Sequence, residues 1–565
     1  MVGNGRERSS RMDGLMMHYP LTIPAMARRA ESLHSRKPIV GRRADGSIER
    51  TTYAEVLRRS RRLIGALREL GVRRGDRVAT FCWNHQQHLE AYYAVPCMGA
   101  VLHTLNIRLA PDEVAYIANH AGDSVILVDR VLLPQFEAIR PHLDVRHVVV
   151  IGGGADTPPG MLDYETLIDQ APEVPFDDDI DENAAAGMCY TSGTTGRSKG
   201  VVYSHRSTAL HSLANGVWDL EFVREREVIL ALVPMFHANA WGLPYAALLY
   251  GSSQVLPSQF LDPGSILGLI ASERVTVVAG VPTIANALLQ TLDADPGRYD
   301  ISSLRLLNLG GAAVPESLIR AFHDRYGLRV QQGWGMTETS PVGSMATLTR
   351  ALDHADDDTR YRHRASQGLP LPFVETRVCD EEGPLPWDGE SMGELEVRGP
   401  WVSSAYYGAP EMADRFTADG WFRTGDIVTI DENGYIFIRD RSKDVIKSGG
   451  EWISSVALEN AIMRHPAVLE AAVIGLRHPT WDERPLAVVV LRAGASCPAG
   501  ELLRHLEPHF PKFWIPNAVE FVNAIPKTSV GKYNKRVMRE QYRDYFIAAP
   551  ALPDPMGKGR SSLTP

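Results

Sequence analysis

Residues 190–201 read Tyr-Thr-Ser-Gly-Thr-Thr-Gly-Arg-Ser-Lys-Gly-Val, and this stretch decides how the rest of the chain is interpreted. Glycines let backbone N–H groups approach an anion closely, hydroxyls add donors, and a lysine adds a point charge suited to phosphate. The stretch lacks the Gly-x-x-x-x-Gly-Lys-Ser/Thr spacing of P-loop proteins, and its composition alone is equally typical of a solvated turn. Our prediction is a nucleotide-phosphate loop formed by Thr191, Ser192, Gly193, Thr194, Thr195, Gly196 and Lys199.

The order of these residues is more specific than their composition. Tyr-Thr-Ser-Gly-Thr-Thr-Gly-x-x-Lys-Gly resembles the signature loop of the adenylate-forming superfamily, which includes acyl-CoA synthetases, adenylation domains of nonribosomal peptide synthetases and firefly luciferase. Ser198 stands where the family commonly has proline. We therefore expect a slightly looser loop that keeps its phosphate donors.

The composition is that of an ordinary folded protein, because 44% of the 565 residues are hydrophobic and 22% are charged. A formal net charge of −9 argues against nucleic acid as the main partner. The five cysteines are scattered without metal-like or redox spacing, which predicts reduced thiols in a cytoplasmic protein. Charged residues interrupt residues 1–22, so no signal peptide is expected, and polar residues and prolines interrupt the apolar stretch 230–251, so no transmembrane segment is expected. Peripheral contact with a membrane stays open.

The pattern of apolar residues predicts an α/β fold. Short, β-branched stretches at 124–129, 145–151 and 275–280 alternate with helix-like segments such as 53–70 and 88–98. Such alternation is typical of layered α/β sheets with largely parallel strands. Residues 394–398 and 435–439 read as strands among Gly-rich turns and predict a more β-rich subdomain.

A compact α+β pattern follows residues 440–441, with a helix at 455–464, strands at 468–474 and 486–491, and a helix from Pro498. Together with the family resemblance, this gives an N-terminal adenylation domain at 1–439, a hinge at 440–443 and a small mobile C-terminal lid domain at 444–547. The Pro-, Gly- and Ser-rich residues 548–565 are expected to be a disordered tail.

A second motif, Gln-Gly-Trp-Gly-Met-Thr-Glu-Thr at 332–339, places an aromatic ring, glycines, a hydroxyl and a carboxylate in one short segment. Alone it reads as readily as a core tryptophan beside a helix start. It resembles the family's Gly-aromatic-Gly-x-Thr-Glu signature, with Trp334 in place of the usual tyrosine. The resemblance implies nucleotide contacts from Gln332, Gly333, Trp334 and Thr337, a catalytic Glu338, and Mg²⁺ held by Thr191 and Glu338. Gly311 belongs to a Gly-Gly-Ala-Ala turn at 310–313 that resembles the adenine-side turn, although taken alone a strand-to-helix turn is the plainer interpretation.

Three further motifs follow in the family's order. Gly-Trp-Phe-Arg-Thr-Gly-Asp at 420–426 resembles the ribose-binding element, which implies that Asp426 holds the ribose hydroxyls. Residues 440–454 resemble the hinge, where a charged linker is the plainer interpretation. The motif at 526–536 resembles the terminal lysine motif, where a basic surface loop is the plainer interpretation. The resemblance assigns nucleotide contacts to Arg441 and Lys443, the CoA side to Lys447, Gly449, Gly450 and Trp452, and the reacting carboxylate and α-phosphate to Lys532.

The resemblance implies ATP-dependent activation of a carboxylic acid as acyl-AMP and its transfer to CoA. Pro-Met-Phe-His-Ala-Asn-Ala-Trp-Gly-Leu-Pro at 234–244 looks like the gate of long-chain fatty acyl-CoA synthetases. This implies that His237 lies beside the acyl carboxylate, as a further catalytic residue, and that Ala238 and Trp241 belong to the gate. The expected substrates are therefore a medium- to long-chain fatty acid, ATP and CoA, with Mg²⁺.

Three alternatives stay open at this point. Segments like 234–244 also occur in methylthioalkanoate CoA ligases, and an aryl acid is a further possible substrate. The acceptor could be a carrier protein instead of CoA, and an inactive nucleotide sensor could be built on the same fold. The long-chain synthetase resemblance also implies a homodimer.

Overall fold

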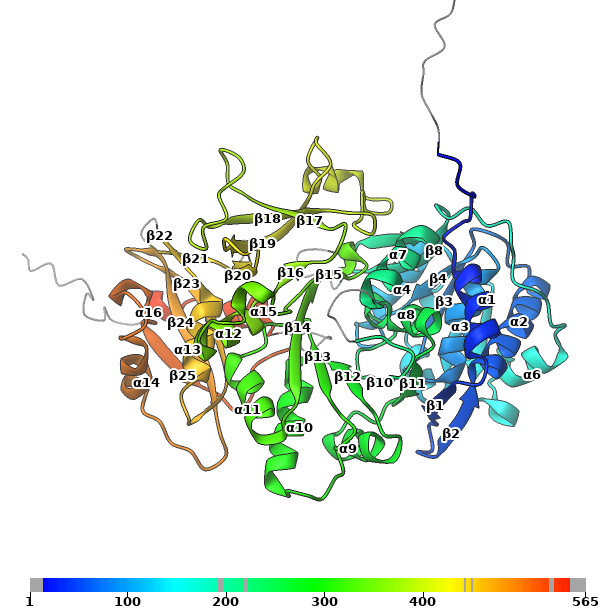
Figure 1. Ribbon diagram of the computed structural model, residues 1–565, viewed down its shortest axis with the longest axis horizontal. Coiled ribbons are helices and arrows are strands. Elements are labelled where there is room, and N and C mark those ends of the chain that lie inside the picture. The colour runs from blue at the N-terminus through cyan, green and yellow to red at the C-terminus, as the bar shows by residue number, and fades with distance from the viewer. Residues whose placement is uncertain are drawn as a thin grey trace, which may run out of the picture.

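The computed structural model describes residues 14–191, 197–216, 222–441, 444–448, 451–527 and 533–548, with Glu451, Trp452 and Ala548 described by their backbone alone. Within these residues the strands form four sheets. Figure 1 shows the N-terminal helices at one end of the molecule and the C-terminal sheet at the other. The two largest sheets lie between them.

The larger central sheet has nine strands with a parallel interior, because every pairing from β1 through β14 in its spatial order is parallel. Its buried strands are short apolar runs such as Val-Val-Ala-Gly in β12, as expected for strands covered on both faces. In spatial order the strands are β16 (Leu369–Pro370), β15 (Val342–Met345), β14 (Arg329–Gly335), β13 (Leu306–Leu309), β12 (Val277–Gly280), β10 (Val228–Ala231), β11 (Ser253–Leu256), β1 (Pro38–Arg42) and β2 (Ile48–Thr52).

The second central sheet has seven strands and is parallel except at β9, which pairs antiparallel with β8. The residues of the first motif leave this sheet where β8 ends and return where β9 begins. In spatial order the strands are β7 (Leu162–Asp163), β6 (His147–Ile151), β5 (Asp123–Asp129), β3 (Arg77–Phe81), β4 (Val101–Thr104), β8 (Ala185–Tyr190) and β9 (Gly200–Ser204).

Helices connect and cover the two central sheets (Figure 1). Helix α3 is buried almost all round, including its polar residues Gln86, His88 and Glu90, and it packs against α2. The helices are α1 (Ile23–His34), α2 (Tyr53–Glu69), α3 (Gln86–Cys97), α4 (Pro111–Ala121), α5 (Leu133–Phe136), α6 (Tyr164–Gln170), α7 (His205–Gly216), α8 (Leu243–Tyr250), α9 (Pro263–Ser272), α10 (Pro282–Ala294), α11 (Glu316–Tyr326) and α12 (Asp357–Arg364).

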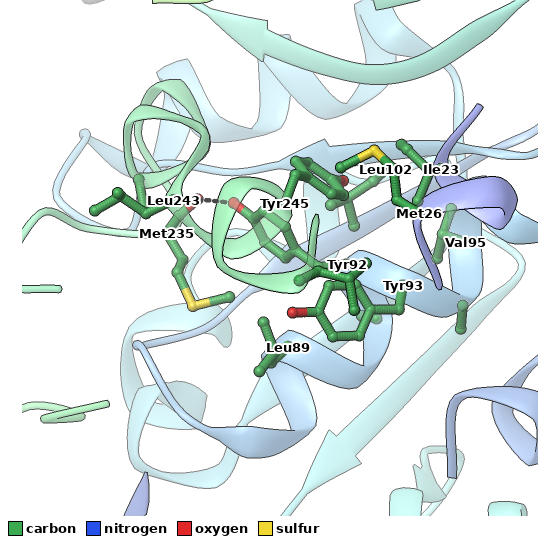
Figure 2. Close-up of a cluster of buried hydrophobic side chains, with 14 of the residues drawn as sticks. Ile23, Met26, Leu89, Tyr92, Tyr93, Val95, Leu102, Met235, Leu243 and Tyr245 are labelled. Atoms are coloured by element: carbon green, nitrogen blue, oxygen red, sulfur yellow. Dashed lines mark hydrogen bonds between the residues drawn. The ribbon is translucent and has the colours of Figure 1, made fainter. Parts of the chain in front are cut away.

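The core between these elements combines apolar packing with buried hydroxyl groups (Figure 2). Tyr92 and Tyr93 on α3 are fully buried, and Tyr93 donates a 3.0 Å hydrogen bond to the carbonyl of Pro244. The hydroxyl of Tyr92 donates to the carbonyl of Met235. The core of α3 therefore fixes the backbone of residues 235–244, which the sequence assigns to the acyl gate.

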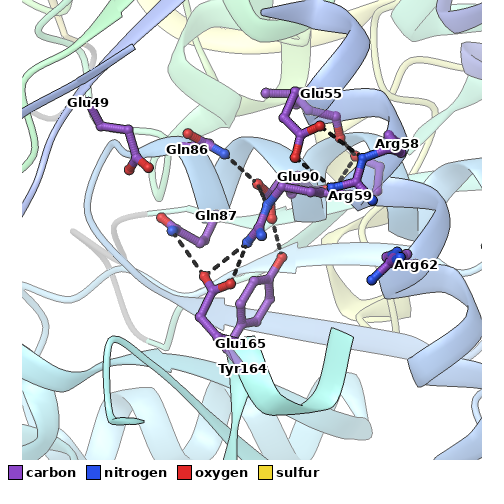
Figure 3. A network of polar contacts seen from close by, with 12 residues as sticks. Glu49, Glu55, Arg58, Arg59, Arg62, Gln86, Gln87, Glu90, Tyr164 and Glu165 are labelled. Carbon is purple, nitrogen blue, oxygen red and sulfur yellow. Dashed lines mark hydrogen bonds and ion pairs between the residues drawn. The ribbon is translucent and has the colours of Figure 1, made fainter. Parts of the chain in front are cut away.

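A buried ionic network joins α2, α3 and α6 (Figure 3). Glu90 accepts from Arg59 at 2.6 Å, from Tyr164 at 2.6 Å and from Gln86 at 2.9 Å, and Arg59 also reaches Glu165 at 2.9 Å. The charged groups of this network are all paired, although Gln86 Oε1 is buried without a partner, so the network holds the helices in register without an unpaired buried charge.

The β-rich subdomain is an antiparallel four-stranded sheet of β17 (Glu375–Cys379), β18 (Gly393–Arg398), β19 (Phe422–Ile430) and β20 (Ile436–Arg441). The C-terminal sheet comprises β22 (Glu451–Ile453), β21 (Ile446–Ser448), β24 (Asp482–Leu491), β23 (Val468–His478) and β25 (Ala518–Phe521), with helices α13 (Ser455–Met463), α14 (Ala499–Leu506), α15 (Lys535–Gln541) and α16 (Tyr545–Ala548).

The predicted α/β class, the β-rich subdomain and the C-terminal α+β unit are confirmed. Strand β20 continues to Arg441, beyond the strand expected at 435–439, because Asp440 and Arg441 still pair with β19. The expected tail falls outside the described residues except for Ala548, which ends α16. No helix among the described residues is both long and apolar enough to cross a membrane. All five cysteines are unpaired thiols, as predicted.

Candidate active site

The two ends of the first motif meet where β8 and β9 open into the loop. The backbone N–H of Thr191 donates to the carbonyl of Lys199 at 2.9 Å, and the N–H of Lys199 donates to the Thr191 hydroxyl oxygen at 3.1 Å. Both residues line a cavity of about 430 Å³, called here the inner cavity. Ser192, Gly193, Thr194, Thr195 and Gly196 lie outside the described residues.

Ser198 is buried, and its backbone N–H donates to the carboxylate of Glu113 on α4 at 2.9 Å. A proline at this position has no N–H and could not make this bond. The departure from the family pattern therefore adds an anchor at this end of the loop. Whether the loop itself is looser remains a prediction.

The second motif places a short 3₁₀ turn, Thr337–Thr339, against the same cavity. The hydroxyl of Tyr203 donates to the Thr337 carbonyl at 2.8 Å, and the hydroxyl of Tyr406 donates to Glu338 Oε1. Burial, with the charge of Glu338, raises the pKa of Tyr406, so its hydroxyl is a donor at neutral pH. The Tyr406 hydroxyl thus holds Glu338 through Oε1, and no hydrogen bond from the described residues engages Oε2.

Trp334, at the end of β14, is almost fully buried and lines the cavity. Its indole N–H donates to Asp426 Oδ2 at 3.0 Å, and Arg441 Nε pairs with Asp426 Oδ1 at 2.7 Å. A Cβ on Gly343 would lie 2.5 Å from the Trp334 ring, so this glycine makes room for the indole. The predicted aromatic and ribose-binding groups are therefore brought into one cluster, in which the tryptophan orients the carboxylate.

The predicted adenine-side turn follows β13 and includes Gly311 at φ +80°, a conformation that favours glycine. Gln332 fixes this turn, because its side-chain oxygen accepts from the N–H of Val314 at 2.5 Å and its amide nitrogen donates to the Ser366 carbonyl at 2.8 Å. The Gln332 side chain therefore holds in place the backbone of the turn that contains Gly311.

The gate segment has an unusual backbone. Ala238, Asn239, Ala240 and Trp241 have φ of 43°, 52°, 48° and 59°, a left-handed turn without glycine that costs about 1–2 kcal/mol per residue. Buried groups hold it: Asn239 Oδ1 accepts from the Cys189 thiol at 3.2 Å and from the Tyr92 hydroxyl at 3.3 Å.

The turn aims the Trp241 ring at the adenine-side turn. A Cβ on Gly310 would lie 3.1 Å from this ring. His237, Ala238 and Trp241 line the inner cavity beside the apolar side chains of Phe222, Val233, Val281 and Met345. The gate residues thus share one cavity with Thr191, Lys199, Thr337 and Glu338.

A second cavity of about 600 Å³, called here the interdomain cavity, lies between α10 and α11 on one side and α13 on the other. Gly311, Trp334, Arg441, Asp444 and Tyr533 line both cavities. Gln332, Gly333 and Asp426 also line the interdomain cavity. A ligand could therefore reach from the phosphate side to the interdomain side past Trp334.

The residues around the predicted hinge form a buried network. Asp440 Oδ2 accepts from the N–H and the hydroxyl of Ser455, both at 2.6 Å. Lys535 donates to the Ser455 hydroxyl at 2.6 Å and pairs with Glu459 at 2.7 Å. Burial disfavours the lysine cation, yet Glu459 and Asp440 outweigh it and raise the pKa of Lys535.

Several predicted residues are not placed. Lys443, Gly449, Gly450 and Lys532 lie outside the described residues, as does the side chain of Trp452 on β22. Lys447 is exposed on β21, and its N–H donates to Glu483 at 3.0 Å. Tyr533, the neighbour of Lys532, lines both cavities.

Sequence reasoning missed Tyr406, Tyr533 and the Lys535 network. The only available signal for Lys535 was its place in the basic run 526–536, which reads equally as a surface loop.

Comparison with known families decides the class. The profile described as "AMP-binding enzyme" matches residues 27–407, and the profile described as "AMP-binding enzyme C-terminal domain" matches residues 457–532. The chain belongs to the AMP-binding enzyme family. The resemblance inferred from the motifs is thereby confirmed.

Curated relatives cover nearly the whole chain. It is 51% identical to a long-chain-fatty-acid–CoA ligase of Thermus thermophilus over 96% of this chain and 99% of that protein. It is 43% identical to a 3-methylmercaptopropionyl-CoA ligase of Ruegeria pomeroyi over 94% and 99%, and 41% identical to a medium-chain-fatty-acid–CoA ligase of Ectopseudomonas oleovorans over 95% and 98%. The chain is thus an AMP-forming acid–thiol ligase, with ATP and CoA as substrates.

Solved structures agree with this class. ATP-bound MatB from Rhodopseudomonas palustris has a TM-score of 0.79 at 30% identity, with 93% of this chain and all of that chain covered. The anthranilate CoA ligase AuaEII in complex with anthranoyl-AMP has a TM-score of 0.83 at 25% identity over 93% of this chain and 98% of that chain. The fold therefore matches that of MatB bound to ATP and that of a CoA ligase bound to anthranoyl-AMP.

Proposed function

We propose that this protein activates a medium- to long-chain fatty acid with ATP and transfers the acyl group to CoA, releasing AMP and pyrophosphate. The observation that carries the proposal is the inner cavity, where apolar side chains adjoin Thr191, Lys199, Thr337 and Glu338. A carboxylate is a poor acyl donor, and joining it to AMP provides a leaving group that a thiol can displace.

In the first half-reaction the carboxylate attacks the α-phosphorus of ATP and pyrophosphate leaves. Catalysis of this step consists mainly of positioning and charge stabilisation. We assign Lys199 and the loop at 191–196 to the departing pyrophosphate, Thr337 to the α-phosphate and Lys532 to the reacting oxygens. His237 would lie beside the acyl carboxylate, and Asp426 with Arg441 would hold the ribose.

Mg²⁺ fits the residues present. Glu338 and Thr191 line the same cavity and offer a carboxylate and a hydroxyl oxygen, and Mg²⁺ is typically bound by one or two carboxylates together with phosphates. When bound there, it would neutralise charge on the phosphates. Tyr406 would keep the Glu338 carboxylate in place.

In the second half-reaction the CoA thiolate attacks the acyl-adenylate. We propose that rotation about 440–443 replaces the Lys532 side of the C-terminal domain by the side of Lys447, Gly449, Gly450 and Trp452. Lys447 is exposed on β21, away from the two cavities, which is consistent with a second working position. Lys532→Ala should abolish pyrophosphate release and spare thioester formation from supplied acyl-AMP. Equal loss of both half-reactions would overturn the assignment.

The overall proposal is tested by following ATP- and CoA-dependent AMP formation over acids from acetate to palmitate. The expected result is a maximum between medium and long chains. The Ruegeria relative makes 3-(methylthio)propionate a second candidate acid, and aryl acids complete the panel. A phosphopantetheinyl carrier protein tested in place of CoA separates the two acceptors. Absence of AMP formation with every acid would refute the proposal.

We also propose a homodimer. Leu15, Met16 and Met17 precede α1 and are 93%, 82% and 94% exposed, and such an apolar segment is a contact that a second copy could cover. Light scattering after size-exclusion chromatography would give the mass of two chains, and removal of residues 1–18 should shift it toward one.

A further inference from the structure

Asn308 is a polar residue on the wall of the inner cavity. It lies on β13 two positions before Gly310, so both residues face the same side of the sheet. Only 1% of Asn308 is exposed to bulk solvent, and it lines the cavity together with Phe222, Val233 and Met345. A buried carboxamide is thus set in an otherwise apolar part of the wall.

The amide of Asn308 is poorly satisfied by the protein. Its nitrogen donates to the thioether of Met345 at 3.7 Å, and this is the only side-chain hydrogen bond that Asn308 makes within the described residues. A thioether is a weak acceptor. The carbonyl oxygen Oδ1 therefore receives no donor from the described part of the chain, although buried carboxamides normally use both of their polar ends.

A structural asparagine in the same core shows the difference. Asn84 donates to the carbonyls of Ala231 at 3.0 Å and Val233 at 2.8 Å, and its oxygen accepts from the N–H of Met235 at 2.7 Å. Asn84 ties three backbone groups together. Asn308 ties none, so its polarity is not explained by local structure.

The neighbouring strand, β14, places a second polar side chain next to Asn308. Gln331 is the lateral partner of Asn308 on β14, and it donates to the Thr347 hydroxyl at 3.0 Å while its own oxygen is buried without a partner. Asn308 is the member of this pair that lines the cavity. A ligand that enters the cavity therefore meets the Asn308 amide first.

We propose that the inner cavity selects carboxylic acids that carry a hydroxyl group on the acyl chain, with that hydroxyl donating to Asn308 Oδ1. An unsubstituted alkyl chain would displace water from this oxygen without replacing its hydrogen bond, whereas a hydroxyl would replace it. This inference rests on the proposed acid–CoA ligase function and specifies its substrate class. A satisfied hydrogen bond of this kind corresponds to about a tenfold preference.

The test compares decanoic acid with its positional hydroxy isomers as substrates of the full-length enzyme, measured as kcat/KM for CoA-dependent AMP formation. The expected result is at least one hydroxy isomer favoured about tenfold over decanoate. Asn308→Leu should abolish that preference and improve turnover of decanoate. Val281→Ile changes the same cavity wall without a polar group, so it should leave the preference intact.

The inference is overturned if the wild-type enzyme favours no hydroxy isomer over decanoate, or if Asn308→Leu keeps the wild-type preference. If Asn308→Leu does not fold, Asn308→Ala needs no extra room and must lose the preference in the same way. Turnover of decanoate and hydroxydecanoates at equal rates refutes only the hydroxyl selection. Absence of turnover with every acid refutes the ligase function itself.

Discussion

Replacing Lys535 by methionine removes the cation that, among the described residues, balances the buried carboxylates of Glu459 and Asp440, while keeping a side chain of similar length. The side chains of Lys535 and Glu459 are only 11% and 10% exposed, and their charged atoms are 2.7 Å apart. Burial raises the pKa of Glu459 and of Asp440, so both carboxylates depend on a nearby cation. Asp440 retains three donors, two from Ser455 and one from the N–H of Arg441, so the loss falls chiefly on Glu459.

The loss of folding free energy in this variant can be calculated from the protonation of Glu459, which would relieve the unpaired buried charge. Without its partner, Glu459 can stay buried by binding a proton, which at pH 7 costs about 1.36 kcal/mol for each unit above an ordinary pKa near 4.3, or about 3.7 kcal/mol. This agrees with the roughly 3–5 kcal/mol lost when one partner of a buried pair is removed. At pH 5 the same proton costs only about 1 kcal/mol. Because the folded variant has the raised pKa, its deficit grows as the pH rises above 4.3.

Urea unfolding of the full-length protein at pH 7 and pH 5, followed by fluorescence and by protection of the C-terminal domain from protease, measures both values. We expect Lys535→Met to lose about 4 kcal/mol at pH 7 and about 1 kcal/mol at pH 5, relative to wild type at each pH. Glu459→Gln in the same chain keeps an acceptor for the N–H of Val473 and should recover most of the loss at pH 7. An equal loss at the two pH values, or no recovery in the double variant, would refute the reasoning.

Three further changes test the site and the core. Tyr406→Phe should lower kcat/KM for ATP about tenfold, because Glu338 loses the hydroxyl that holds it; an unchanged value in a pyrophosphate-release assay contradicts this. Trp334→Phe should raise KM for ATP about fivefold with kcat nearly unchanged, because Asp426 loses an orienting donor, and steady-state kinetics would show it. Burial lowers the pKa of His205 to about 4, so its contribution to stability is lost as the pH falls from 6.5 toward 4. Between pH 7 and 5.5 His205→Asn should therefore lose about 1 kcal/mol less stability than wild type, and an equal loss would argue against a neutral buried histidine.

The sequence was sufficient to predict an element and its functional residues wherever both lie in one contiguous segment. Buried strands such as β5 and β12 have apolar centres, Val-Ile-Leu-Val and Val-Val-Ala-Gly, and each signature motif places its functional residues within about a dozen positions. Such patterns are visible in the sequence because a strand covered on both faces needs a contiguous apolar segment and a phosphate loop uses neighbouring backbone groups.

The remaining features depend on partners far apart in the chain. Tyr406 and Glu338 are separated by 68 positions, and Lys535 and Ser455 by 80, so no motif contains both members of either pair. The left-handed turn at Ala238–Trp241 is likewise not predictable from the sequence. Non-glycine residues rarely adopt positive φ, so tertiary contacts must impose this conformation. Asn308 reads as one polar position in an apolar strand until its cavity is known.

The hinge network also limits how the proposed rotation can proceed. Asp440 and Arg441 are adjacent, yet their side chains are anchored to different parts of the molecule: Asp440 to Ser455 at the start of α13, and Arg441 to Asp426 on β19. A rotation that carries α13 away must break the Asp440–Ser455 bonds, whereas the Arg441–Asp426 pair lies wholly within the β-rich sheet and can persist. The groups proposed to hold the ribose would therefore keep their arrangement while the C-terminal domain moves. An acyl-adenylate could thus stay bound between the two half-reactions.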